Sequence, residues 1–381
     1  MKKNFLIFII LLANLSSCNI TNKNNRLGTD ALTMQYGQEK FMSLDSMTTQ
    51  ETVYIQYLND GRIAFYNLSA HNICVFDVEK GEEVEKIQLY KEGPNSVRGI
   101  QGLYYDSADS IWLYQSWEKN LVLVNNKGII VDKRNLQDKI AQSSLKNRLS
   151  VEPFPLTDMP IRKVDDLFVL QGFNGPEVVN GFRPACSVFY DLKADTVSVA
   201  NEYPSIYGEP SKMNDNWGTF SYRAIPYTLN EYKMVLSFPA SDDIYVYDLK
   251  SGKKESYFAG TSLETDISSI EGVQKSQLEK HYLEQLQYAG IFYDKYNDLY
   301  YRLAVLPIFD YDIHDKQTQQ KPLAVIILNS NFEKVGEFNL GIGRYKYRNV
   351  FVSKEGLHLN VYSEDDDYLK FITLKVLKNE K

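Results

Sequence analysis

Short apolar runs that alternate with polar residues recur along most of the chain. The stretch 60–77 shows the pattern best. It opens with the turn pair Asp60-Gly61, and then Ile63 and Phe65 alternate with smaller or polar residues, which is the period of a half-buried strand. A polar break follows, and a second apolar run, 73–76, ends at an aspartate. We therefore expect an antiparallel hairpin here.

The same unit returns several times. Each copy has a strand, a turn, a second strand that ends in Asp or Asn, a turn with Gly or Lys, and a third strand. The lead strands begin near residues 62, 110, 166, 232, 298 and 348. Several strands per unit, at a period of about 50 to 65 residues, are typical of β-propeller blades.

These units predict an all-β fold, a β-propeller with six blades. An N-terminal strand from the region 31–58 is expected to complete the last blade and close the ring, which removes exposed sheet edges. A ring of seven blades is the alternative if the long interval between the third and fourth units contains another blade. Two insertions interrupt the pattern, residues 138–160 and residues 265–288, and the second predicts a short helix over about 276–287.

The first 17 residues have the pattern of a signal peptide. Lys2 and Lys3 precede the apolar run 5–13, which is too short to span a bilayer as a mature helix. The following Leu15-Ser16-Ser17-Cys18 resembles the lipobox of bacterial lipoproteins. That resemblance implies cleavage before Cys18 and a diacylglycerol on its sulfur, whereas an ordinary secretory signal is the alternative.

The chain is thus expected to divide into three parts: a lipoprotein signal peptide (1–17), a lipidated tether (18–30) and a single propeller domain (31–381). The lipid on Cys18 would make the membrane a partner and place the protein in the cell envelope, at the outer membrane. No acidic cluster follows Cys18, so we expect the periplasmic face at least as much as the cell surface.

A Gly-Pro turn lies between the first and second units. Gly93, Pro94 and Asn95 belong to the segment 91–97, KEGPNSV, which resembles the "G-x-G-P-G-x-F" turn of NHL-like six-bladed propellers. Together with the lipobox, this turn makes the chain similar to uncharacterised propeller lipoproteins of Bacteroidetes, a family of unknown function. The resemblance implies that the turn shapes an inter-blade connection, and it supplies no catalytic residue.

Charge and composition exclude one class of partner. The net charge is −7, and it becomes −9 once Lys2 and Lys3 are removed with the leader, since 40 basic and 49 acidic side chains remain. A nucleic-acid-binding protein needs a basic face, so we expect no nucleic-acid partner. The 28 tyrosines fit a strand-rich protein, because the ring packs on a sheet while the hydroxyl reaches water.

The sequence offers no catalytic constellation. The four histidines lie far apart and lack metal-ligand spacing, and no G-x-S-x-G motif is present. Cys74 and Cys186 are expected to be buried free thiols, because equivalent positions in non-adjacent blades lie too far apart for a disulfide. We therefore predict no catalytic residue, no metal ligand and no cofactor.

The best candidate for a ligand site is the loop 203–227, which is rich in aromatic residues. Its candidate residues are Tyr207, Trp217, Phe220, Tyr222 and Arg223. We expect a binding or scaffold module whose partner is a small molecule, a glycan or another protein. The alternative is a lactonase- or lyase-like propeller enzyme, which would require several carboxylate or amide side chains around a metal ion in the channel.

Overall fold

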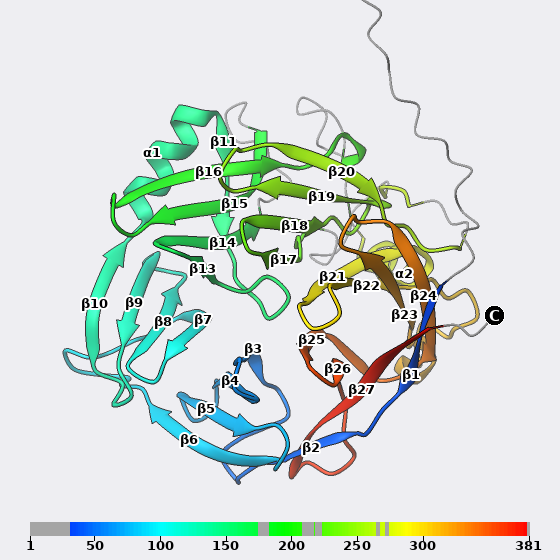
Figure 1. Cartoon of the computed structure of the whole chain (residues 1–381), viewed down its shortest axis with the longest axis horizontal. Helices are drawn as coiled ribbons and strands as arrows, with labels where there is room; N and C mark the ends of the chain where they lie inside the picture. The colour runs from blue at the N-terminus through cyan, green and yellow to red at the C-terminus, as the bar shows by residue number, and fades with distance from the viewer. Residues whose placement is uncertain are drawn as a thin grey trace, which may run out of the picture.

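The sheets of the computed structural model are arranged in a ring around a common centre (Figure 1). The structure describes residues 31–173, 183–207, 217, 223–263, 267–270 and 274–378. Blades 1, 2 and 4 are separate four-stranded antiparallel sheets, and blade 3 is a six-stranded sheet. Blades 5 and 6 form one nine-stranded sheet, since β1 joins their outer strands. Counting this sheet as two blades gives six.

In blades 1, 2, 4 and 5 the strands follow one another outward from the centre of the ring. Blade 1 contains β3 (Val53–Tyr57), β4 (Arg62–Asn67), β5 (Asn72–Asp77) and β6 (Glu82–Gln88). Blade 2 contains β7 (Ile100–Ser107), β8 (Ser110–Gln115), β9 (Asn120–Val124) and β10 (Ile130–Asn135). Blade 3 contains β11 (Leu149–Ser150), β12 (Glu152–Pro153), β13 (Arg162–Val164), β14 (Leu167–Phe173), β15 (Arg183–Asp191) and β16 (Thr196–Glu202).

The second half of the ring follows the same plan. Blade 4 contains β17 (Tyr227–Asn230), β18 (Lys233–Ser237), β19 (Asp243–Asp248) and β20 (Lys254–Phe258). Blade 5 contains β21 (Gln287–Asp294), β22 (Leu299–Val305), β23 (Pro322–Asn329) and β24 (Lys334–Ile342). Blade 6 contains β25 (Tyr345–Ser353), β26 (Gly356–Val361), β27 (Tyr368–Lys378), and the N-terminal strands β1 (Leu32–Tyr36) and β2 (Lys40–Ser43).

The N-terminal strands close the ring, as the sequence predicts. Both β1 and β2 pair antiparallel with β27, the last strand of the chain. Buried Lys40 connects this edge to its neighbours, because its Nζ lies 2.7 Å from a Glu79 carboxylate oxygen in blade 1 and 3.1 Å from Glu355 in blade 6. The closing blade is therefore assembled from both ends of the chain.

The sequence-based unit lacks one strand per blade. In blades 2 to 5 the three predicted strands are the outer three, and the innermost strand was missed, whereas the inner strand β3 of blade 1 lies in the region 31–58, where a strand was expected. Two of the missed strands, β7 and β21, contain a register shift that breaks the alternation of apolar residues. Among the described residues between β16 and β17 there is a 3₁₀ turn, η3 (Ser205–Tyr207), and no further strand, so they add nothing in favour of a seventh blade.

Two helices lie in the predicted insertions. The helix α1 (Gln137–Asn147) packs against β11 and β16 at the outside of blade 3. The helix α2 (Lys275–Glu284) lies before β21 and ends three residues earlier than predicted, because Gln285 already has an extended backbone. Another 3₁₀ turn, η5 (Lys316–Gln319), lies between β22 and β23. None of the described helices is long and apolar enough to cross a membrane.

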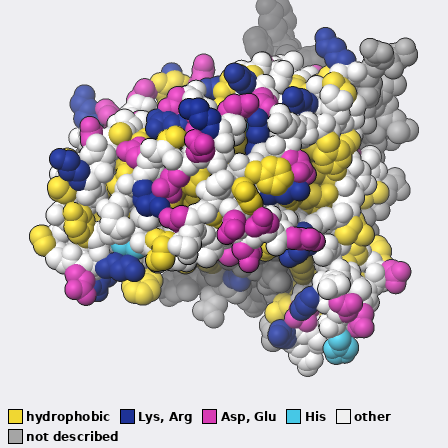
Figure 2. Space-filling view, turned by 90° about the horizontal axis from the view of Figure 1, so that it is seen from below, with side chains coloured by type: hydrophobic (Ala, Val, Ile, Leu, Met, Phe, Trp, Pro, Cys, Tyr) yellow, Lys and Arg dark blue, Asp and Glu magenta, His cyan; other side chains and the backbone are white. Residues whose placement is uncertain are grey.

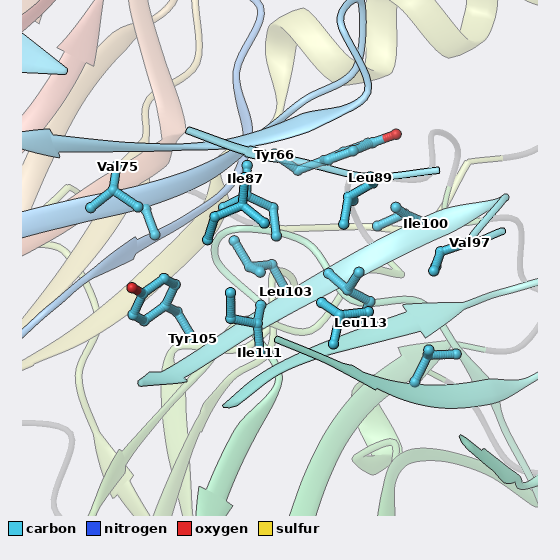
Figure 3. Close-up of a cluster of buried hydrophobic side chains, with 14 of the residues drawn as sticks. Tyr66, Val75, Ile87, Leu89, Val97, Ile100, Leu103, Tyr105, Ile111 and Leu113 are labelled. Atoms are coloured by element: carbon cyan, nitrogen blue, oxygen red, sulfur yellow. The ribbon is translucent and has the colours of Figure 1, made fainter. Parts of the chain in front are cut away.

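Hydrophobic clusters between neighbouring blades form the core. Figure 3 shows the cluster between blades 1 and 2, where Val75 and Ile87 meet Leu103 and Leu113. Strand β8 serves two clusters, since Ile111 and Leu113 face blade 1 and the alternate residues Trp112 and Tyr114 face blade 3. Each such side chain contributes about 1.5–3 kcal/mol on burial. The middle strands therefore have continuous runs of apolar residues, and these runs allowed the strands to be predicted from the sequence.

The remaining features agree with the composition. Cys74 and Cys186 are buried free cysteines, as expected. The side of the ring seen in Figure 2 carries basic and acidic side chains interspersed with small hydrophobic groups. This face therefore lacks the single-sign charge that nucleic acid requires.

His358 in the closing blade makes stability dependent on pH. Its ring is fully buried, stacks on Phe351 at 4.5 Å between centroids, and lies within hydrogen-bond distance of Ser353 and Thr373. Thr373 donates its hydroxyl proton to the Gln38 carbonyl, so its oxygen accepts from Nδ1–H. Burial lowers the pKa of His358 to about 3, and the charges of Lys40 and Lys375 add to that effect.

We expect the free energy of unfolding to fall as the pH drops below about 6.5, where His358 of the unfolded chain binds a proton that the folded protein excludes. The contribution is about 1.4 kcal/mol per pH unit at most. Urea unfolding at pH 7, 6 and 5 measures it. In a His358→Asn variant the free energy of unfolding should change less with pH than in the wild type. The His314→Asn variant, which alters an exposed histidine, should show the same change as the wild type. If the free energy of unfolding changes equally with pH in all three proteins, His358 is not the source of the pH dependence.

Candidate functional site in the central channel

The innermost strand of blade 3 is interrupted, and the interruption occupies the centre of the ring. Both β12 and β13 pair antiparallel with β14, but the eight residues between them leave the sheet. Leu156 and Met159 exchange two backbone hydrogen bonds of 3.1 Å, which place Thr157 and Asp158 at the tip of a tight turn. We call residues 154–161 the hub hairpin.

The hub hairpin touches the inner strands of all the other blades. Thr157 Oγ1 accepts a hydrogen bond of 3.2 Å from the backbone N–H of Ile55 in blade 1. The carbonyl of Asp158 accepts one of 3.2 Å from Tyr227 in blade 4. In blade 2, a Cβ added to Gly102 would lie 2.7 Å from Ile161, so only glycine fits at this contact. Blade 5 approaches Asp158 at another glycine, Gly290.

Blade 6 contributes an ion pair to the same hairpin. Arg348 Nη1 in β25 lies 2.7 Å from Asp158 Oδ2, and the Asp158 side chain is completely buried. The second carboxylate oxygen, Oδ1, has no hydrogen-bond partner among the described residues. Burial raises the pKa of Asp158, and the charge of Arg348 offsets only part of that effect. The pair therefore joins blades 3 and 6 at the centre of the ring.

A pocket lies below the hub hairpin. We call the face with the turns between the first and second strands of each blade the lower face, and the opposite face the upper face. The lower pocket has a volume of about 210 Å³ and opens beside the turn residues Asn59, Lys295 and Tyr296. Other lining residues come from the hub hairpin and the inner strands: Ile55, Tyr57, Thr157, Pro160, Arg162, Tyr227, Phe292 and Phe351.

Arg162 is the distinctive residue of the lower pocket. It is the first residue of β13, directly after the hub hairpin, and desolvation lowers its pKa. The side chain makes no hydrogen bond or ion pair with any described residue. Two other arginines have partners within the fold: Arg348 pairs with Asp158, and Arg302 donates to several backbone carbonyls, among them Ser241 at 2.7 Å.

The electrostatics of the lower pocket favour an anion. None of the described side chains that line it is acidic, and its charged groups are Arg162 and Lys295. Lys295 donates to Asn59 Oδ1 at 2.7 Å, so it remains a cation without a carboxylate at the rim. Tyr57 and Phe351 form a flat wall, with stacked rings 5.4 Å apart. An anionic group can therefore bind Arg162 while a small organic body lies against the aromatic wall.

Comparison with known proteins places this architecture in a family. The model of DUF4221, a domain of unknown function, matches residues 31–339. The chain belongs to the DUF4221 family. A DUF4221 member from Bacteroides vulgatus has 20% identity and a TM-score of 0.74, with 92% of this chain and 100% of that chain covered. A putative exported protein from Bacteroides fragilis has 10% identity and a TM-score of 0.56, with 93% and 97% covered.

These likenesses concern the fold, since both identities are low. They confirm the expectation of a propeller-like chain from a family of unknown function with relatives in Bacteroides. Comparison with curated proteins finds no match.

The predicted ligand loop of this DUF4221 chain is only partly described. Tyr207 and Trp217 are buried in the cluster between blades 3 and 4, where their ring centroids lie 5.0 Å apart. The backbone carbonyl of Arg223 accepts a hydrogen bond of 2.5 Å from the Tyr203 hydroxyl. Phe220 and Tyr222 lie outside the described residues, as does Cys18. A ligand site in this loop therefore stays a prediction.

The predicted Gly-Pro turn lies between β6 and β7, where the chain passes from the outer strand of blade 1 to the inner strand of blade 2. Gly93 has φ of +83°, and its carbonyl accepts a hydrogen bond of 3.1 Å from Ser96. Asn95 Oδ1 accepts one of 3.2 Å from the backbone N–H of Ile130 in β10. These contacts are those of an inter-blade connection.

The enzyme hypothesis required carboxylate or amide side chains that converge in the channel. Among the described residues, no group of three or more His, Cys, Asp or Glu side chains could hold a metal ion. Asp158 occupies the centre, but it is engaged with Arg348. The described channel therefore provides no positive support for that alternative.

The sequence analysis missed the hub hairpin and Arg162. It identified residues 138–160 as an insertion, but it did not place the insertion in the channel. The available signal was an aspartate between two prolines, in FPLTDMP, within a stretch that is otherwise apolar. An aspartate in such surroundings needs a cationic partner when it is buried, and the alternating arginines and lysine of Arg344–Arg348 were the candidates.

We expect removal of one member of the central ion pair to cost more than removal of both. Asp158→Leu or Arg348→Met alone leaves a buried charge unpaired and should lower the free energy of unfolding by about 3–5 kcal/mol. The double variant should lose less than either single variant, because no charge is then left unpaired. Urea unfolding of the four proteins measures this coupling. Additive losses would show that the two residues act independently.

Proposed function

We propose that this DUF4221 protein is a binding module that takes up a small ligand with a carboxylate or phosphate group in the lower pocket. The observation that carries the proposal is Arg162, a desolvated guanidinium without a hydrogen-bond or ion-pair partner among the described residues. The Arg162 side chain is half-buried and lines the pocket, so an anionic ligand would give its guanidinium the partner that no described residue provides. The pocket volume of about 210 Å³ suits a molecule of a few non-hydrogen atoms.

We further propose that the module is held at the cell envelope through a lipid on Cys18. The lipobox-like residues 15–18 and the polar segment 19–30 support this proposal. The first strand, β1, begins at Leu32 beside Lys378, the end of β27, which is at the lower face. A tether attached there would keep the lower face nearest to the membrane.

Removal of the Arg162 charge should abolish anion binding without loss of stability. Arg162→Met removes a desolvated cation, so the ligand-free variant should melt at the wild-type temperature or above it. The melting temperature is measured with phosphate, sulfate, acetate and succinate at constant ionic strength. At least one anion should raise the melting temperature of the wild type more than that of the variant, because a ligand that binds only the folded state stabilises it.

The comparison between variants is needed because phosphate and sulfate stabilise most proteins without binding to a site. Arg98→Met is the matched control, since Arg98 is an exposed arginine in the connection between blades 1 and 2. It should respond like the wild type. If every anion raises the melting temperature of Arg162→Met and of the wild type equally, the lower pocket is not an anion site.

Lipid attachment is tested by Cys18→Ala in the full-length chain expressed in a Gram-negative host. We expect the wild type to incorporate labelled palmitate and to sediment with membranes, because the lipid provides the anchor. The variant should carry no label and should stay in the soluble fraction. Label in both proteins, or in neither, would refute the proposal.

A further inference from the structure

A second pocket lies on the upper face, between blades 5 and 6. It has a volume of about 230 Å³ and is separate from the lower pocket, with which it shares no lining residue. Four tyrosines, two glutamines and two cations dominate its lining: Tyr282, Tyr345, Tyr347, Tyr362, Gln319, Gln320, Lys321 and Arg344. No acidic side chain is among the described residues that line this upper pocket.

Lys321 is held at the base of the pocket by the end of α2. Its buried Nζ donates to the backbone carbonyls of Tyr282, at 2.5 Å, and Gln285, at 2.6 Å. These two acceptors use two of the three donors of an ammonium group. No carboxylate forms an ion pair with Lys321 among the described residues. Its Nζ also lies 4.8 Å from the centre of the Tyr282 ring, and burial lowers the pKa of Lys321 to about 7, so a bound anion would favour the charged form of the lysine.

Arg344 provides the second cation, at the mouth of the pocket. Its guanidinium lies 4.9 Å from the centre of the Tyr362 ring and makes no hydrogen bond or ion pair with a described side chain. The neighbouring Lys346 also lies over Tyr362, but its Nζ is bound to the Gln50 carbonyl at 2.8 Å and to Glu51 at 3.0 Å. Arg344, in the connection between β24 and β25, is thus the cation that no described side chain engages in a hydrogen bond or an ion pair.

We infer that the upper pocket binds a carboxylated sugar, such as a hexuronic acid unit at the end of a glycan. Tyrosine rings offer flat faces for the C–H groups of a sugar, and the amides of Gln319 and Gln320 can donate to and accept from hydroxyl groups. Lys321 and Arg344 hold the carboxylate. A phosphate dianion fits less well, because the carbonyl end of the α2 dipole points to the same place and repels dense negative charge.

The sugar site is independent of the anion site in the lower pocket, and the test separates the two. Purified protein from residue 29 onward is titrated with glucuronate, glucose, acetate and phosphate at equal ionic strength, and binding is followed by calorimetry or by NMR chemical shifts. We expect glucuronate to bind at least tenfold more tightly than glucose or acetate, because sugar contacts and carboxylate contacts act together. Phosphate should not compete with it.

Variants locate the site. Arg344→Met and Tyr362→Ala alter exposed side chains, so both proteins should fold, and each should bind glucuronate at least fivefold more weakly. Arg134→Met, an arginine on the outer strand of blade 2, and Arg162→Met in the lower pocket should bind it like the wild type. The inference is overturned if glucuronate binds no better than acetate, or if Arg344→Met and Tyr362→Ala leave its affinity unchanged. Loss of binding only in Arg162→Met would place the sugar in the lower pocket instead.

Discussion

The pair of Asp158 and Arg348 is the contact on which the centre of this ring depends. In a propeller each blade packs against its two neighbours, and no contact between blades holds the whole ring together. Here one hairpin from blade 3 reaches the inner strands of the five other blades. One of its contacts is the ion pair between Arg348 and the Asp158 carboxylate, which has no exposure to solvent. Because an unpaired buried charge is so costly, this carboxylate fixes the position of blade 6 relative to blade 3.

Three arginines of the inner strands and blades differ in their partners. Arg348 is paired with the Asp158 carboxylate, and fully buried Arg302 is surrounded by carbonyl oxygens and the face of Tyr288. Both therefore have partners within the fold. Among the described residues, half-buried Arg162 has neither kind of partner. The difference singles it out as the arginine whose partner would come from solution.

Much of the fold could be predicted from the sequence, and the reasons lie in particular strands. Middle strands such as β8 bury side chains on both sides, between two blades, so their apolar runs are long and easy to recognise. Inner strands such as β7 and β21 contain register shifts, so the alternation of apolar residues is lost and these strands were missed. The site was harder still, because it depends on contacts between residues nearly 200 positions apart, as in Asp158 and Arg348, which no local pattern encodes.

The hub hairpin belongs to only one of the two pockets. Thr157 and Pro160 line the lower pocket, and no residue of the hub hairpin lines the upper pocket. β25 nevertheless lines both pockets, with Tyr345 and Tyr347 above Arg348 and Phe351 below it. With the tether that we propose at the lower face, the lower pocket takes its ligand from the side of the membrane and the upper pocket from the opposite side. A single strand then joins two sites that open to different surroundings.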